Sequence, residues 1–310
     1  MKLAAPKSVR VKALIALAMV CFFWGTTWVA SRQGVQYMPV FQLAGIRQSI
    51  GGLLYVLFFT IKGATYPKGK EWIPIIILSL LNFFLSNGLS TWGVKYITGG
   101  LGAIIAAIFP LWIVIINLLF KKSIINAVTF TGLLLGFAGV CIIFYDHLLD
   151  FLNPHFRFGI IVSLFASLSW AFGTLYTKSQ AANFNPYFSL GFQMLFSGLT
   201  TSLIAYTTKQ TVPLNEIPWQ AWTSIAYLVV FGSVLAYMAY LYALQNLSTE
   251  QASIYAYMNP VIAMLVGALL FQEKLTIYIG IGGLVTLAGV RLINIGSKRD
   301  SKKQPAYEPE

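Results

Sequence analysis

Ten apolar stretches, each close to 20 residues long, follow one another along this chain of 310 residues. A stretch of that length spans the hydrocarbon core of a bilayer as an α-helix. Charged residues make up only 10% of the chain and the mean hydropathy is +0.73, which excludes an ordinary soluble domain. We predict transmembrane helices over residues 12–31, 40–61, 73–93, 99–120, 127–145, 159–178, 187–207, 222–244, 252–271 and 277–295.

The stretches form two similar sets of five. Trp24–Arg32 reads WGTTWVASR, and about 146 residues later Trp170–Lys178 reads WAFGTLYTK. A similar offset relates Pro110 to Pro260, and repeats of this size in an apolar chain are typical of transporters. Because five is odd, the second set enters the membrane from the opposite side. We predict an all-α membrane protein with ten transmembrane helices in two inverted five-helix repeats. Its parts are the first repeat 1–145, a connecting loop 146–158, the second repeat 159–296 and a cytoplasmic tail 297–310.

The basic residues are unevenly distributed between the two ends of the predicted helices. If the N-terminus is cytoplasmic, fifteen of the 21 Lys and Arg residues fall on the cytoplasmic side and five on the other, while Arg47 lies within a helix. This asymmetry follows the positive-inside rule and accounts for the net charge of +12 without a nucleic-acid partner. We therefore expect both termini in the cytoplasm.

No pattern in the sequence indicates a catalytic, cofactor or metal site. The two cysteines, Cys21 and Cys141, both lie in predicted helices, and zinc-ligand spacings, HExxH and Gly-rich phosphate loops are missing. All nine acidic residues fall in loops, tails or helix ends, so a proton relay at membrane depth is not expected. We expect a protein that is not an enzyme and holds neither a cofactor nor a metal.

One proline lies near the middle of the fourth apolar stretch in each set of five. Pro110 and Pro260 each lack an N–H group, and they should free the carbonyls of Ala106 and Ala256. Interrupted helices at matching positions of two repeats indicate a transport site, so we predict that both prolines act as hinges. The alternative is a packing kink without ligand contact.

Five side chains within the predicted helices are candidates for binding a solute. Arg47 would hold a carboxylate, or it would satisfy carbonyls and the neighbouring Gln48. Trp24 and Trp170 would line a cavity for an apolar or zwitterionic solute, or fill the seam between the repeats. The other two candidates are Asn87 and Tyr237, which bring polar atoms into apolar helices.

Three motifs stand out: WGxxW at Trp24–Trp28, its WAxG counterpart at Trp170–Gly173, and PVIAMLVGALLFQEKLT from Pro260 onwards. With these motifs the chain resembles the EamA-like family of the drug/metabolite transporter superfamily. The resemblance implies a bacterial cytoplasmic-membrane carrier that exports amino acids or other small metabolites from a central cavity. The family often has a glutamate thirteen residues after each proline; Glu273 fits this pattern, but Ser123 stands in the first repeat.

Other functions stay open. Within transport, the alternative solutes are nucleotide sugars, which call for several buried basic groups, and cationic drugs, which call for an embedded carboxylate. Outside transport, the alternatives are a membrane scaffold and a membrane-embedded enzyme acting on lipid. The expected partners are a small-molecule metabolite and the lipid bilayer.

Overall fold

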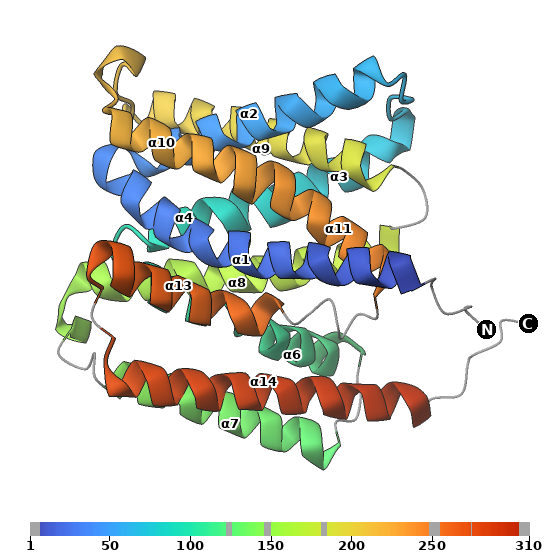
Figure 1. Cartoon of the computed structure of the whole chain (residues 1–310), viewed down its shortest axis with the longest axis vertical. Coiled ribbons are helices and arrows are strands. Elements are labelled where there is room, and N and C mark those ends of the chain that lie inside the picture. The colour runs from blue at the N-terminus through green and yellow to red at the C-terminus, as the bar shows by residue number, and fades with distance from the viewer. Residues whose placement is uncertain are drawn as a thin grey trace, which may run out of the picture.

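The computed structural model describes residues 7–121, 126–145, 150–180, 185–247, 255–273 and 275–303 (Figure 1). Every regular element in these segments is a helix, which confirms the all-α prediction. Six helical segments of the described chain are long and apolar enough to cross a membrane. They are Ser8–Tyr37, Val40–Ile61, Gly69–Gly93, Pro154–Thr177, Pro186–Thr207 and Trp219–Ala243. The fourth and fifth predicted spans of each set correspond to shorter apolar helices.

The first half of the chain begins with two long helices, and shorter helical elements follow them. Its elements are α1 (Lys7–Tyr37), α2 (Val40–Ile61), η1 (Gly69–Glu71), α3 (Trp72–Leu78), η2 (Ser79–Gly88), α4 (Leu89–Gly93), α5 (Gly99–Ala106), α6 (Phe109–Lys121) and α7 (Ala127–Tyr145). Thr98 begins α5, because its side-chain oxygen accepts a hydrogen bond from the N–H of Leu101.

The second half follows a similar order, with the single helix α13 in place of α5 and α6. Its elements are η3 (Asp150–Leu152), α8 (Pro154–Gln180), α9 (Pro186–Thr207), η4 (Leu214–Glu216), α10 (Trp219–Tyr227), η5 (Leu228–Leu235), α11 (Ala236–Asn246), α13 (Tyr255–Phe271) and α14 (Ile277–Lys303). Pro186 starts α9, where a missing N–H costs nothing, and Asn185 caps the helix. The helix α14 continues beyond the predicted end of its span at residue 295.

Both halves contain a π-helical segment at the same place. The segments η2 and η5 begin about 149 residues apart, each within the third membrane crossing of its half. In a π-helix each N–H bonds to the carbonyl five residues earlier, so the backbone carries an extra residue per turn. Such insertions are frequent at functional sites. The segment η2 lines the cavity described below, and η5 bonds to side chains that line it.

The contacts that the helices of one half make have counterparts in the contacts that the matching helices of the other half make. The helix α2 packs along α9, and α7 packs along α14 (Figure 1). The first helix of one half, α1, contacts α11, η5 and α13 of the other half. Its counterpart α8 contacts η2, α4, α5 and α6. Each half therefore packs its first helix against the third and fourth crossings of its partner.

Glycines allow α7 and α14 to approach each other closely. A side-chain carbon on Gly132 would lie 2.7 Å from the carbonyl oxygen of Gly289, and one on Gly289 would lie 2.8 Å from Gly136 Cα. These contacts fit the packing role that small residues have between membrane helices. A side-chain carbon on Gly280 or Gly283 would have no neighbour within 4 Å, so these two glycines do not form the helix contact.

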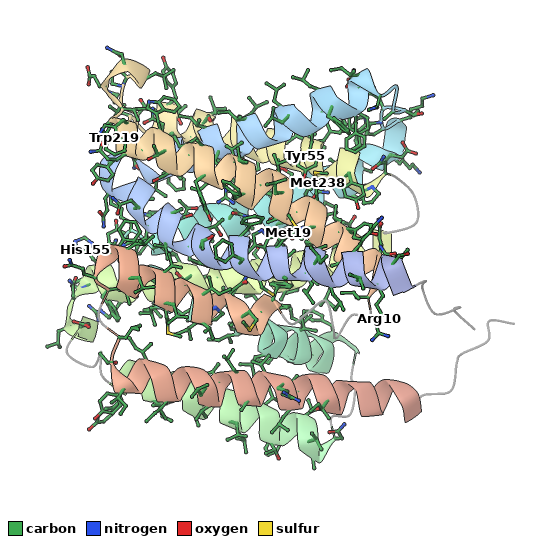
Figure 2. The ribbon with its side chains drawn as sticks, viewed as in Figure 1. Arg10, Met19, Tyr55, His155, Trp219 and Met238 are labelled. Atoms are coloured by element: carbon green, nitrogen blue, oxygen red, sulfur yellow. The ribbon has the colours of Figure 1, made fainter. Side chains whose placement is uncertain are left out.

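The outer surface of the bundle is rich in apolar side chains (Figure 2). On α2 these include Leu53, Leu57 and Phe58, and on α7 they include Phe130 and Phe137, each at least 46% exposed. Exposed apolar area of this extent is unusual on a soluble monomer but is expected where lipid is the solvent. The fold is that of a multi-pass membrane protein.

Candidate functional site

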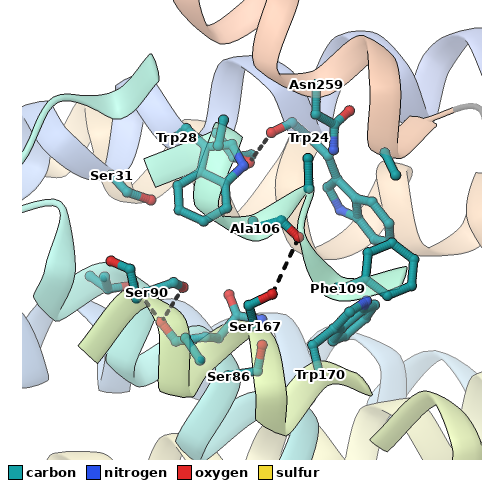
Figure 3. A pocket seen from close by; sticks show the side chains of 18 of the residues that line it. Trp24, Trp28, Ser31, Ser86, Ser90, Ala106, Phe109, Ser167, Trp170 and Asn259 are labelled. Atoms are coloured by element: carbon teal, nitrogen blue, oxygen red, sulfur yellow. Dashed lines mark hydrogen bonds between the residues drawn. The ribbon is translucent and has the colours of Figure 1, made fainter. Parts of the chain in front are cut away.

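A cavity of about 130 Å³ lies at the centre of the bundle (Figure 3). This is close to the size of a cavity that holds benzene, roughly 150 Å³. Its walls come from α1, α2, η2, α4, α5, α6, α8, α11 and α13. All five side chains that the sequence nominated line it: Trp24, Arg47, Asn87, Trp170 and Tyr237. The structure thus brings them together, while their role in binding stays a prediction.

Aromatic rings form one wall of the cavity. The ring of Trp24 lies edge-to-face against Trp170, with ring centres 6.2 Å apart. It also lies 4.9 Å from Tyr237 and 5.1 Å from Tyr255. Phe109 stacks on Tyr255 at 6.4 Å. Electron-rich ring faces in such a group attract a cation and also accommodate apolar groups.

Arg47 brings a positive charge to the cavity from the middle of α2. Its side chain is only 5% exposed, and its Nε donates to Ser233 Oγ at 3.1 Å. Among the described residues, no carboxylate forms an ion pair with Arg47 and no acidic residue lines the cavity. The expected contact with Gln48 does not appear among the described hydrogen bonds of Arg47. A buried guanidinium without a protein carboxylate favours an anionic ligand group.

Three consecutive residues of η5 accept hydrogen bonds from side chains of α1 and α2. The carbonyl of Gly232 accepts from Trp24 Nε1 at 3.2 Å, and Ser233 accepts from Arg47. The hydroxyl of Tyr55 donates to the Val234 carbonyl at 2.8 Å. A side-chain carbon at Gly232 would lie 2.7 Å from Thr27 Cγ2 and 3.1 Å from Arg47 Nη2, so a larger residue there would displace these side chains. The π-helical segment therefore fixes two of the nominated side chains, a contact that the sequence did not predict.

Asn87 and Tyr237 meet at the middle of the molecule, where the two halves face each other. They occupy matching positions 150 residues apart, and Asn87 Nδ2 lies 3.4 Å from the Tyr237 hydroxyl oxygen. The same nitrogen lies 3.4 Å from the carbonyl of Asn82, in η2. With Trp24 and Trp170, this is the second pair of equivalent residues that touch across the seam.

The two prolines have different surroundings. Pro110 lies in the first turn of α6, after a break that follows Ala106, whereas Pro260 lies inside the continuous helix α13. The expectation of matching interruptions is therefore wrong at these positions. The helix α13 continues through Pro260 because a proline within a helix removes one backbone hydrogen bond and bends the helix without ending it. The freed carbonyl of Ala106 is reached by Ser167 Oγ at 3.4 Å (Figure 3).

Several cavity residues were missed by the sequence analysis. On α1, Thr27, Trp28 and Ser31 share the face of Trp24 at spacings of three, four and seven residues. On α8, the face of Trp170 carries a similar stripe that includes Ser163 and Ser167. The repeated hydroxyl spacing was a usable signal, since i, i+4 and i+7 positions share one helix face.

Asn259 was also missed, although it directly precedes Pro260. Its amide nitrogen lies 3.1 Å from the Cys21 carbonyl and 3.0 Å from the Tyr255 carbonyl, once the amide is oriented to donate to both. It lines the cavity and joins α13 to α1.

Among the described residues, no group of three or more His, Cys, Asp or Glu side chains could hold a metal ion.

Comparison with known proteins gives the family. The model of the EamA-like transporter family matches residues 11–145 and residues 157–295. The chain belongs to this family. Its match in two stretches covers most of the chain, and the protein is accordingly a membrane transporter. The resemblance found from the Trp24 and Pro260 motifs is confirmed.

Similar proteins come from several groups of organisms. The uncharacterized transporter YvbV of Bacillus subtilis is 25% identical over 93% of each chain. The uncharacterized inner membrane transporter YedA of Escherichia coli K12 is 29% identical over 85% of this chain and 83% of its own. The WAT1-related protein At3g02690, chloroplastic, of Arabidopsis thaliana is 28% identical over 90% of this chain and 68% of its own. One crystal structure aligns with a TM-score of 0.66 at 15% identity, covering 94% of this chain and 99% of that chain, which shows the shared fold alone.

Proposed function

We propose that this protein exports small organic metabolites, amino acids or related compounds, from the cytoplasm by alternating access. The observation that carries this proposal is the central cavity between the two halves, which combines one buried guanidinium with a group of aromatic rings. Arg47 would bind the carboxylate of the solute, and Trp24, Trp170 and Tyr237 would surround its ammonium or apolar part. Asn87 and the hydroxyl groups would complete the polar contacts.

We further propose the full ten-helix arrangement as two inverted repeats, 1–145 and 159–296, joined by the loop 146–158. The exchange symmetry of the helix contacts supports it, as do the Trp24–Trp170 and Asn87–Tyr237 contacts. Inverted repeats allow alternating access, because each half can adopt the conformation of the other. Residues 146–149, and 304–310 of the tail 297–310, lie outside the described residues.

The cavity favours this solute class over the alternatives. Nucleotide sugars carry two phosphates, and Arg47 is the single basic residue among the described cavity-lining residues. Cationic drugs call for a carboxylate, and the lining contains none. The volume of about 130 Å³ also fits a small solute better than a nucleotide. A scaffold or lipid enzyme would not explain a buried guanidinium facing a cavity.

Metabolite efflux tests the proposal directly. Cells that express the protein and matched cells without it are loaded with amino acids as dipeptides, and the medium is analysed for free amino acids by mass spectrometry. We expect faster release of one or a few amino acids from the expressing cells. Equal release of every amino acid and organic acid measured, with the protein present in the membrane, would exclude this function.

The orientation of the chain gives a second test. The charge asymmetry supports a cytoplasmic location of both termini. We expect green fluorescent protein fused after Glu310 to fluoresce, whereas alkaline phosphatase fused at the same place should be inactive, because it needs the periplasm. An active phosphatase fusion would contradict the even number of crossings.

The hinge role of the prolines is tested by alanine substitution. We expect Pro110→Ala and Pro260→Ala each to lower the efflux rate about tenfold, because the hinge becomes stiffer. The amount of protein in the membrane should stay the same, because alanine restores a backbone N–H group and does not destabilise the helix. The effect of Pro260→Ala should be accompanied by a straighter α13. Unchanged efflux in both variants and in the double variant would favour simple packing kinks.

A further inference from the structure

Glu273 connects the two halves at a point outside the cavity. It follows the end of α13, and its carboxylate reaches the start of α5 in the other half. Oε1 accepts a hydrogen bond from the N–H of Gly99 at 3.0 Å, and Oε2 accepts from the N–H of Gly100 at 3.4 Å. The first N–H groups of a helix lack partners and attract negative charge, so a carboxylate is well placed there.

The chain takes an unusual turn to place this carboxylate. Gln272 has a φ of +54°, in the left-handed region that non-glycine residues seldom occupy. The N–H of Glu273 then donates to the carbonyl of Gly267 at 3.2 Å, and the side chain folds back over Gly267. A side chain at Gly267 would collide with the carboxylate. Backbone strain of this kind persists where surrounding contacts compensate for it, and the two hydrogen bonds to α5 are such contacts.

The contact lies beyond the cavity, on the side opposite to the proposed cytoplasmic termini. The start of α5 rests on α1, where a side-chain carbon at Gly99 would lie 3.2 Å from the Trp28 carbonyl. One turn further along α5, Ala103 lines the cavity. A buried cluster of Val29, Ala103 and Ala263 joins the three helices next to it. The Glu273 contact therefore joins α5, α1 and α13 at the outer ends of helices that line the cavity.

The two ends of the protein differ in this feature. Thirteen residues after Pro260 stands Glu273, whereas thirteen residues after Pro110 stands Ser123, which has no carboxylate. The structure of Ser123 lies outside the described residues. By sequence alone, the carboxylate is present at the outer end and missing at the equivalent inner position.

We propose that Glu273 is the latch of the outer gate. Its bonds to Gly99 and Gly100 hold when the cavity is closed to the outside, and they break when the solute is released. This inference rests on the proposed alternating access. Because hydrogen bonds to a charged group are stronger than neutral ones, the outer end opens less readily than the inner end. The carrier then favours a state that loads solute from the cytoplasm.

Cysteine labelling measures the latch without any solute. Cys21 and Cys141 are replaced by alanine, and Ser31, which lines the cavity on the outer part of α1, becomes the reporter as Ser31→Cys. Intact cells are treated with a membrane-impermeant maleimide, and the labelled fraction is followed with time. We expect Glu273→Gln to speed labelling about tenfold, in line with the strength of hydrogen bonds to a charged acceptor.

Two further variants make the result decisive. Glu273→Asp keeps the charge on a shorter side chain and should give an intermediate rate. Glu216→Gln removes an exposed carboxylate from η4, which lies outside the gate, and should leave the rate unchanged. Rates are normalised to membrane-inserted protein, so lower expression does not mimic an open gate. Equal rates in Glu273→Gln and its parent would overturn the latch, even if efflux of amino acids is observed.

Discussion

Replacing Arg47 by methionine is expected to abolish most transport while making the folded protein more stable. Methionine occupies the equivalent position of the second half, at Met194, and it fits a buried apolar site. A buried arginine in a membrane helix costs about 3 kcal/mol on insertion scales, and removing it should recover part of that cost. Losing a charge-assisted contact to a carboxylate should lower efflux by about 100-fold, since such contacts contribute up to about 3 kcal/mol.

The combination of the two effects separates the possible roles of Arg47. Efflux and the apparent Tm of the purified protein are measured for Arg47→Met and Arg47→Lys. If Arg47 is structural, its loss leaves Ser233 without its partner, and both Tm and efflux should fall together. If Arg47 binds the solute, Tm holds or rises as efflux falls. Arg47→Lys should retain partial activity, because lysine keeps the charge but cannot form a bidentate pair.

Much of the fold could be predicted from apolar length alone. The bilayer requires long apolar helices, so the positions of α1, α2, α8 and α9 are visible as hydropathy. The five nominated residues were chosen because polar or aromatic groups at membrane depth are costly, and the same cost makes them face an internal cavity. This is why Trp24, Arg47 and Tyr237, distant in sequence, line one site.

The finer features were hidden because they depend on neighbours rather than on local composition. A π-helical segment such as η5 is made of the same apolar residues as an α-helix. The hydrogen bond from Trp24 Nε1 to the Gly232 carbonyl therefore could not be predicted from the sequence. Pro110 and Pro260 look equivalent in the sequence, but Ser167 supports the carbonyl near one of them. Glu273 is at a helix end, and only the fold shows that α5 meets it there.

The contact between α7 and α14 provides the second large effect. We expect Gly289→Ala to destabilise the protein by about 3 kcal/mol, the upper range for overpacking a tight contact. The new carbon would lie 2.7 Å from the Gly132 carbonyl oxygen and 2.8 Å from Gly136 Cα. Both neighbours are backbone atoms of α7, so no side chain can rotate away. The helices would have to separate along their length, because close approach is what holds membrane helices together.

Gly283→Ala is the matched control, because it makes the same substitution in the same helix where no atom lies within 4 Å. It should be neutral, or stabilising by up to about 1 kcal/mol from the higher helix propensity of alanine. Unfolding of the purified proteins is followed by thermal denaturation in detergent. A lower Tm for Gly289→Ala alone places the cost in the helix contact. Equal Tm values would mean that α14 shifts freely against α7. The α7–α14 contact would then no longer count, beside the α2–α9 contact, as a close packing between matching helices of the two halves.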